Sequence, residues 1–175
     1  MAFRRLFSTL TYNTSANPKV FMEVSKNGVP AGKMVFQLYA NHAPNLSENF
    51  SDLCTSGDRS FVGTKFSKGH AGLGIQGGDL HEEENWGAGL MRLPDENLEM
   101  RHHKRGLLTM MNVGPHSNGS QFMVTFNEAP HLDGYHNVVG ELIEGEYVLS
   151  SMEQDCHRDG KVHNEWSVTA SGSQY

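Results

Sequence analysis

Glycine is the feature that most constrains the fold of this chain. The sequence holds 19 glycines among 175 residues, and they are spread from Gly28 to Gly172 instead of being confined to one segment. Glycine destabilises helix interiors and favours turns and close backbone contacts. The pattern therefore favours many short strands joined by turns over a helical bundle. No internal repeat or linker divides the chain, so we expect one globular domain.

Alternation of apolar residues predicts the first two strands. Apolar residues occupy every second position from 20 to 24 and again from 34 to 38. The dipeptide Asn27-Gly28 lies between these segments and favours a tight turn. We therefore expect a hairpin. The residues expected to face the core are Val20, Met22, Val24, Met34, Phe36 and Leu38, and those expected on the opposite face of the first strand are Phe21, Glu23 and Ser25.

Two segments have the spacing of helices. Residues 43–57 carry Pro44, which suits a first helical turn, and Gly57, which suits a helix end. Residues 144–155 form a second, shorter helical segment. The expected apolar stripe of the first helix is Leu46, Phe50, Leu53 and Cys54, and the expected inner face of the second is Tyr147, Val148, Ser151 and Met152.

The remaining segments read as strands and loops. Strand patterns occur at 106–112, 120–126, 136–143 and 165–170, whereas residues 57–105 predict loops broken by short strands. Many short strands with two helices favour a mostly β fold over alternating strands and helices. We therefore expect a closed β-barrel capped by helices.

Composition excludes several classes of function. The formal net charge of −6 argues against a nucleic-acid partner, which requires clustered lysine and arginine. No run approaches the roughly 18 apolar residues of a membrane span. Cys54 and Cys156 lie far apart without a CxxC motif, so we expect two unpaired thiols.

The first 16 residues differ in character from the rest. They carry Arg4 and Arg5 but no acidic residue, and the apolar residues between Phe3 and Leu10 have helical spacing. This composition is typical of a mitochondrial targeting segment. We predict a mitochondrial location, with a cytoplasmic chain as the alternative. The same segment is also a candidate for docking into a multiprotein assembly.

The segment FSKGHAGLGIQGGD, residues 66–79, raises the question of a ligand site. It contains no GxxxxGK[ST], and its GxGxxG pattern at residues 72–77 does not lie between a clear strand and a clear helix, so it does not predict a phosphate loop. Neither HxxxH nor HExxH occurs, and Ser120 lacks the GxSxG elbow of a hydrolase. We expect no metal and no cofactor. The remaining inventory of amide side chains, apolar neighbours and one cation, Lys68, suits an uncharged peptide.

Three motifs resemble the cyclophilin family, the cyclosporin-binding peptidyl-prolyl cis-trans isomerases. They are QGGD at 76–79, MNVGPHSNGSQF at 111–122 and LDGYHNVVGEL at 132–142. The resemblance covers residues 17–175 and leaves 1–16 as an extension. It implies an eight-stranded antiparallel β-barrel capped by two α-helices. It also implies a rotamase that acts on proline-containing peptide or protein segments during protein folding.

The resemblance assigns site residues and shows departures from the family pattern. Lys68 stands where the family has its catalytic arginine, and Gln76 is the second expected catalytic residue. Gly74 replaces a methionine and is expected to add space. Eight positions are expected to bind substrate. Four of them match the family: Asn112, Gln121, Leu132 and His136. The other four differ, with Leu73 and Met123 where phenylalanine is usual, Met111 in place of alanine, and His131 where many members have tryptophan.

These departures leave two functions open. The first is a cyclophilin-like isomerase with weakened activity and weak cyclosporin binding. The second is a non-catalytic cyclophilin-like subunit with a structural or peptide-binding role in a larger, mitochondrial assembly.

Overall fold

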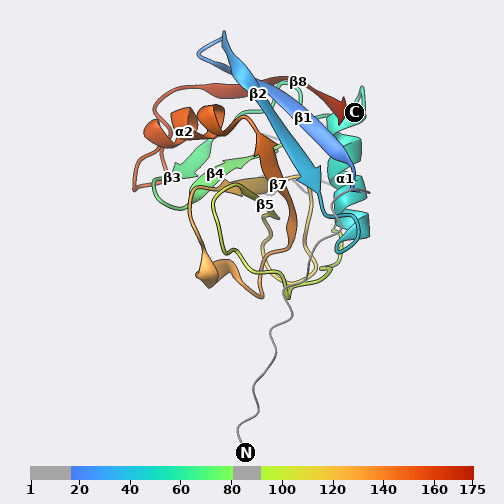
Figure 1. Cartoon of the computed structure of the whole chain (residues 1–175). Helices are drawn as coiled ribbons and strands as arrows, with labels where there is room; N and C mark the ends of the chain where they lie inside the picture. Colours follow the sequence, from blue (N-terminus) through green and yellow to red (C-terminus); the bar gives the residue numbers. More distant parts are fainter. Residues whose placement is uncertain (1–16, 81–91) are drawn as a thin grey trace, which may run out of the picture.

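The computed structural model describes residues 17–80 and 92–175, which form one curled antiparallel sheet with a helix on each of two opposite sides (Figure 1). The 8 strands lie in the order β3-β4-β6-β5-β7-β2-β1-β8. The strands are β1 (Lys19–Lys26), β2 (Val29–Leu38), β3 (Lys68–His70), β4 (Gly74–Gly77), β5 (Leu107–Met110), β6 (Phe122–Thr125), β7 (Val138–Glu144) and β8 (Trp166–Gln174). The helices are α1 (Pro44–Thr55), α2 (Glu146–Gln154) and the short 3-10 helix η2 (Pro130–Leu132). The predicted fold class is confirmed.

Hydrogen bonds bring the two edges of the sheet together. The segment just before β3 runs beside β8, the strand at the opposite edge. The Phe66 amide donates to the Trp166 carbonyl at 2.9 Å, and the Val168 amide donates to the Thr64 carbonyl at 3.0 Å. These bonds satisfy backbone groups that an open edge would expose, and they curl the sheet towards a barrel.

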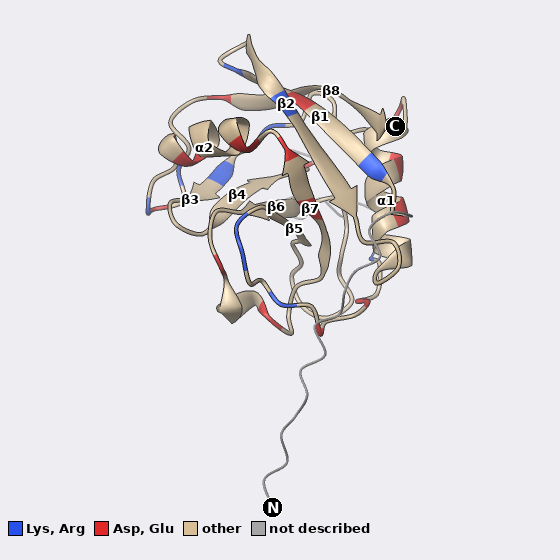
Figure 2. Cartoon of the chain, viewed as in Figure 1, with Lys and Arg blue, Asp and Glu red and all other residues tan. Residues whose placement is uncertain are grey.

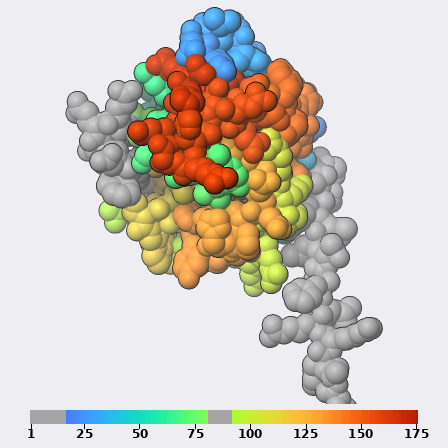
Figure 3. All heavy atoms as spheres, turned by 90° about the vertical axis from the view of Figure 1, so that its left-hand side faces the viewer, coloured from blue at the N-terminus to red at the C-terminus, as the bar shows by residue number. Residues whose placement is uncertain are grey.

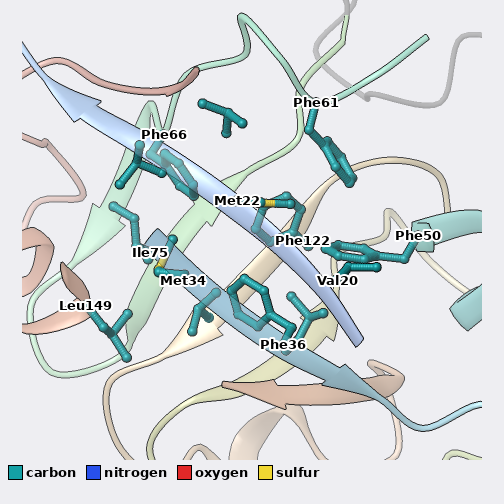
Figure 4. Close-up of a cluster of buried hydrophobic side chains, with 14 of the residues drawn as sticks. Val20, Met22, Met34, Phe36, Phe50, Phe61, Phe66, Ile75, Phe122 and Leu149 are labelled. Atoms are coloured by element: carbon teal, nitrogen blue, oxygen red, sulfur yellow. The ribbon is translucent and has the colours of Figure 1, made fainter. Parts of the chain in front are cut away.

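The predicted hairpin of β1 and β2 forms. Its side chains alternate between the two faces of the sheet, which explains which of them reach the core. Val20 and Met22 are fully buried, as expected (Figure 4). Ser25 was expected on the outer face but is also buried, with its hydroxyl 2.9 Å from that of Ser167. The strand pairing shifts register between Val24 and Ser25. The extra residue is Ala31 of β2, because Val24 pairs with Gly32 and Ser25 pairs with Pro30. Ser25 lies directly opposite Ser167 in the pairing of β1 with β8, so its burial comes from this cross-strand contact.

Aromatic side chains fill the space between the sheet and α1. Phe50 of α1 lies 5.3 Å from Phe122 of β6 and 5.0 Å from Phe61, measured between ring centroids. Figure 4 shows Phe50 and Phe122 side by side, with Phe36 and Val20 close to them. Edge-to-face pairs of this kind contribute about 0.5–1.5 kcal/mol each beyond the area they bury.

The inner face of α2 differs from the predicted one. Val148 and Met152 are buried as expected, but Tyr147 is 62% exposed and Leu149 is fully buried in its place. The helix begins after Gly145, which has a φ of 95°. The sequence pattern did not show that this sharp entry sets the rotation of a nine-residue helix.

A distant carboxylate caps the start of α1. Ala43 offers no side-chain cap. Instead, Glu96 accepts hydrogen bonds from the amides of Asn45 at 3.1 Å and Leu46 at 2.9 Å. The Glu96 amide donates to the Asn137 side chain at 2.9 Å. A negative charge at a helix N-terminus satisfies free amides and complements the helix dipole, so Glu96 joins α1 to the loop that precedes β7.

A buried histidine ties the loop before β5 to the residues after η2. The side chain of His102 is 0% exposed, and its Nδ1 donates to Asp133 Oδ1 at 2.9 Å. Its Nε2 lies 2.9 Å from the Thr109 hydroxyl. Burial lowers the pKa of His102 below its usual value, although the hydrogen bond and charge of Asp133 act in the opposite direction. His131 and His136 also lower it through their positive charge when protonated.

We predict that the free energy of unfolding falls as the pH drops below 6.5, the ordinary pKa of histidine. In that range the unfolded chain binds a proton at residue 102, whereas the folded chain keeps His102 neutral. Chemical denaturation at pH 7.5, 6.5 and 5.5 measures the effect. His102→Gln should flatten the pH dependence, and the exposed control His103→Gln should not. A wild-type stability that stays constant across this range would contradict the prediction.

Candidate functional site

Three of the expected polar site residues line one cavity of about 670 Å³: Lys68, Gln76 and Gln121. Lys68 lies opposite Gln76 in the pairing of β3 with β4. The lysine is exposed, whereas both glutamines are half-buried. In Figure 2 the blue stretch of β3 marks this lysine. The register of β3 with β4 therefore places Lys68 beside Gln76, and Gln121 lines the same cavity.

The opposite wall of this cavity was not predicted from the sequence. It comes from the irregular segment 58–67, which contributes Arg59, Thr64 and Lys65, while Asp79 lies on the near side. The wall is thus mainly polar and charged. This segment contains no motif and no periodic pattern, so sequence reasoning had no signal for it.

The expected apolar residues gather in a separate cluster. Met123 and Leu132 are buried together with Ala129, and Leu73 and Met111 pack against them. Met123 is 1% exposed and Leu132 is 8% exposed. The apolar surface available to a ligand therefore comes mainly from Leu73 and Met111, which are half-buried.

Gly74 does not add the space that was expected from the loss of a larger residue. A Cβ built on Gly74 would lie 2.7 Å from Met123 Cγ and 2.7 Å from the Val124 carbonyl oxygen. The Met123 side chain therefore fills the volume above Gly74. The glycine on β4 and the methionine on β6 compensate for each other in packing.

Hydrogen bonds orient the remaining expected residues. Asn112 donates through its side-chain amide to the Tyr135 carbonyl at 2.8 Å, so this amide joins the segment after β5 to the segment after η2. His136 Nδ1 donates to the Met110 carbonyl at 3.1 Å, which leaves Nε2 as the hydrogen-bond acceptor of the ring. Burial lowers the pKa of His136 and keeps the ring neutral. His131 is exposed on η2.

A comparison with known families decides the identity of this fold and site. A family model described as "Cyclophilin type peptidyl-prolyl cis-trans isomerase/CLD" matches residues 20–171. The match spans all eight strands and both α-helices of the sheet described above. The chain belongs to the cyclophilin family. Cyclophilin domains bind proline-containing peptides.

Within the described residues of this cyclophilin, no group of three or more His, Cys, Asp or Glu side chains is placed to hold a metal ion. In the same residues no helix is long and apolar enough to cross a membrane. Cys54 and Cys156 are free and buried, as expected. Burial raises the pKa of Cys156 to about 11 and holds that of Cys54 well above its usual range, so neither thiol is a ready nucleophile.

We predict that Gly74→Ala lowers the stability of this cyclophilin by about 1–3 kcal/mol, the usual cost of overpacking. The added methyl group would collide with Met123 and with a carbonyl oxygen that cannot move freely. Gly57→Ala is the matched control, because nothing lies within 4 Å of a Cβ built there. Thermal denaturation of both variants measures the difference. Equal stability of the two variants would show that Met123 does not occupy this volume.

Proposed function

We propose that this cyclophilin binds proline-containing segments and catalyses their cis-trans isomerisation with reduced efficiency. The observation that carries the proposal is the position of Lys68 beside Gln76 and Gln121 on one cavity. Lys68 carries a positive charge at the position where, by resemblance, the family's catalytic arginine donates a hydrogen bond to the prolyl nitrogen. The planar guanidinium fork is replaced by an ammonium group.

The chemistry requires no nucleophile, no metal and no redox group. Amide resonance sets a barrier of about 18–20 kcal/mol to rotation about the peptide bond. A donor that binds the twisted, pyramidal nitrogen better than the planar one lowers this barrier. In this site Lys68 is the donor, and Gln76 and Gln121 supply amides that fix the neighbouring peptide groups.

Lysine is a weaker donor than arginine for this task. Its ammonium group is a flexible point charge, whereas the arginine fork has a fixed aim and binds through two donors. The loss of one well-placed charged hydrogen bond costs about 1.5–3 kcal/mol. This corresponds to roughly a ten- to hundredfold lower rate.

The apolar side of the site adds to the loss. Met123 is turned against Gly74 and exposes almost no surface to a ligand. Leu73 offers a smaller apolar side chain than the phenylalanine usual at its position. Each missing ring contact removes about 0.5–1.5 kcal/mol of binding.

We expect Lys68→Arg to raise kcat/KM by about tenfold or more, because it restores the bidentate donor. Exchange spectroscopy on an Ala-Pro peptide measures the rate without a coupled protease. Lys19→Arg is the control, because Lys19 is equally exposed but lies on β1 and does not line the cavity. The unmodified protein should turn over this peptide at roughly one hundredth of the rate of a family member with arginine.

Two outcomes would contradict this reading. A wild-type rate equal to that of an arginine-bearing member would show that the ammonium group suffices. No gain in Lys68→Arg would place the defect in the apolar cluster around Met123 instead.

The burial of Met123 also favours a second candidate function, a peptide-binding or structural subunit without catalysis. Although the buried Met123 offers little apolar surface for a proline ring, the polar cavity beside Lys68 remains available for a peptide. We propose a mitochondrial location for either function. The composition of residues 1–16, which lie outside the described residues, supports it.

We predict that the full chain, fused to a fluorescent protein, enters mitochondria and that a chain without residues 1–16 stays in the cytosol. Size fractionation of native mitochondrial extract then separates the two functions. Elution in a large assembly supports the subunit, and elution as a monomer supports the independent isomerase. Cytosolic fluorescence of the full-length fusion would overturn the proposed location.

A further inference from the structure

A second group of side chains that bear on ligand binding lies away from the peptide site, on the hairpin formed by residues 155–163. The His157 amide donates to the Lys161 carbonyl at 2.9 Å, and the His163 amide donates to the Asp155 carbonyl at 2.8 Å. An isolated antiparallel bridge joins Cys156 to Val162 between them. These bonds fix the two arms of the hairpin relative to each other.

The hairpin presents two histidines that face each other. Nε2 of His157 contacts Nε2 of His163. The ring centroids lie 3.8 Å apart and the ring planes are inclined at 72°. Both residues are exposed, so solvent and ions reach the space between the rings.

The base of the hairpin is firmly held. Asp155 binds Lys26 Nζ at 2.8 Å, Asn164 Nδ2 at 2.9 Å and Trp166 Nε1 at 2.8 Å. This carboxylate joins β1, the start of β8 and the hairpin. The backbone positions of both histidines are therefore set before any ligand arrives, which reduces the entropy cost of binding.

The hairpin also borders β3, the strand that carries Lys68. The Gly69 amide donates to the Gly160 carbonyl at 3.1 Å, and the Ala71 amide donates to the His157 carbonyl at 3.0 Å. Figure 3 shows the orange-red residues of this C-terminal region packed around the green residues near 70. His70 of β3 lies over Gly160, where a Cβ would approach its ring to 2.7 Å.

Two imidazole nitrogens held next to each other on one hairpin can chelate a single ion. Imidazole is a preferred ligand of Zn²⁺, Cu²⁺ and Ni²⁺, and zinc binds histidine nitrogen at about 2.0–2.1 Å. A small opening of the two exposed rings would admit an ion between the Nε2 atoms. We propose that His157 and His163 together bind a divalent transition ion, with Zn²⁺ as the representative case.

The chemistry of such a site follows from its ligand set. Because no third protein ligand gathers with the pair among residues 17–80 and 92–175, water completes the coordination. The ion would bridge the two arms of the hairpin and stabilise the folded chain by mass action, since the unfolded chain does not hold the pair together. The site is independent of the proposed isomerase activity.

Calorimetric titration of the full chain with Zn²⁺, after treatment with a chelator and its removal, tests the proposal. We expect one saturable site per chain. His157→Gln and His163→Gln should each weaken binding by about tenfold or more, because a single imidazole loses the advantage of chelation. His103→Gln, at another exposed histidine, is the matched control and should bind as the wild type does.

Thermal denaturation gives a second readout. Zn²⁺ should raise the Tm of the wild type and of His103→Gln, but not that of either pair variant. If a pair variant fails to fold, paramagnetic broadening by Cu²⁺ in the unmodified chain decides, and it should affect the ring signals of His157 and His163 first. Equal Zn²⁺ binding by all four proteins, no saturable site, or broadening centred on other histidines would each overturn the proposal.

Discussion

The register between β3, β4 and β6 is the constraint on which the rest of the site depends. Lys68 pairs with Gln76, and Gln76 pairs with Met123. Thr109 of β5 continues this row and receives the buried His102 beside it. Residues directly opposite each other in antiparallel strands share one face of the sheet. A slip by one residue would turn the whole row towards the core. The positions of Lys68, Gln76 and the apolar cluster therefore all depend on this one register.

Successive residues of a strand point to opposite faces of the sheet, so the residues that pack in the core are separate from the candidate site residues. Ile75 and Phe122 each neighbour a member of this row in sequence, and both are buried in the main core. The inner face can therefore keep its apolar packing while the outer face changes its side chains. The exchange of volume between Gly74 and Met123 is an example, because it preserves contact between the strands while it leaves the Met123 side chain buried. This explains how a chain can keep the cyclophilin fold and still carry an altered site.

Sequence patterns predicted the local features of this structure better than the long-range ones. The first hairpin and α1 follow from periodicity and turn residues, which act over a few positions. The error at Ser25 arises where a cross-strand partner, Ser167, buries an outer side chain. The error at Tyr147 arises where a helix begins after a left-handed glycine. The capping of α1 by Glu96 could not be predicted from local sequence patterns, because Glu96 and its partners lie about 50 residues apart in sequence. The family motifs indicated candidate site residues, but only packing showed which of them are buried.

The exposure of Lys68 supports the proposed weak catalysis with a reason that the loss of the guanidinium fork alone does not give. A charge in contact with water acts through a high dielectric, so its effect on a developing lone pair is small. A flexible ammonium group must also lose rotamer freedom to reach the prolyl nitrogen. Catalytic donors are effective when the surrounding structure holds them in place before reaction. Within the described residues, no hydrogen bond or ion pair fixes the Lys68 side chain. An arginine at this position would bring its own rigid geometry, whereas lysine requires support that the cavity wall around Arg59 and Lys65 does not supply.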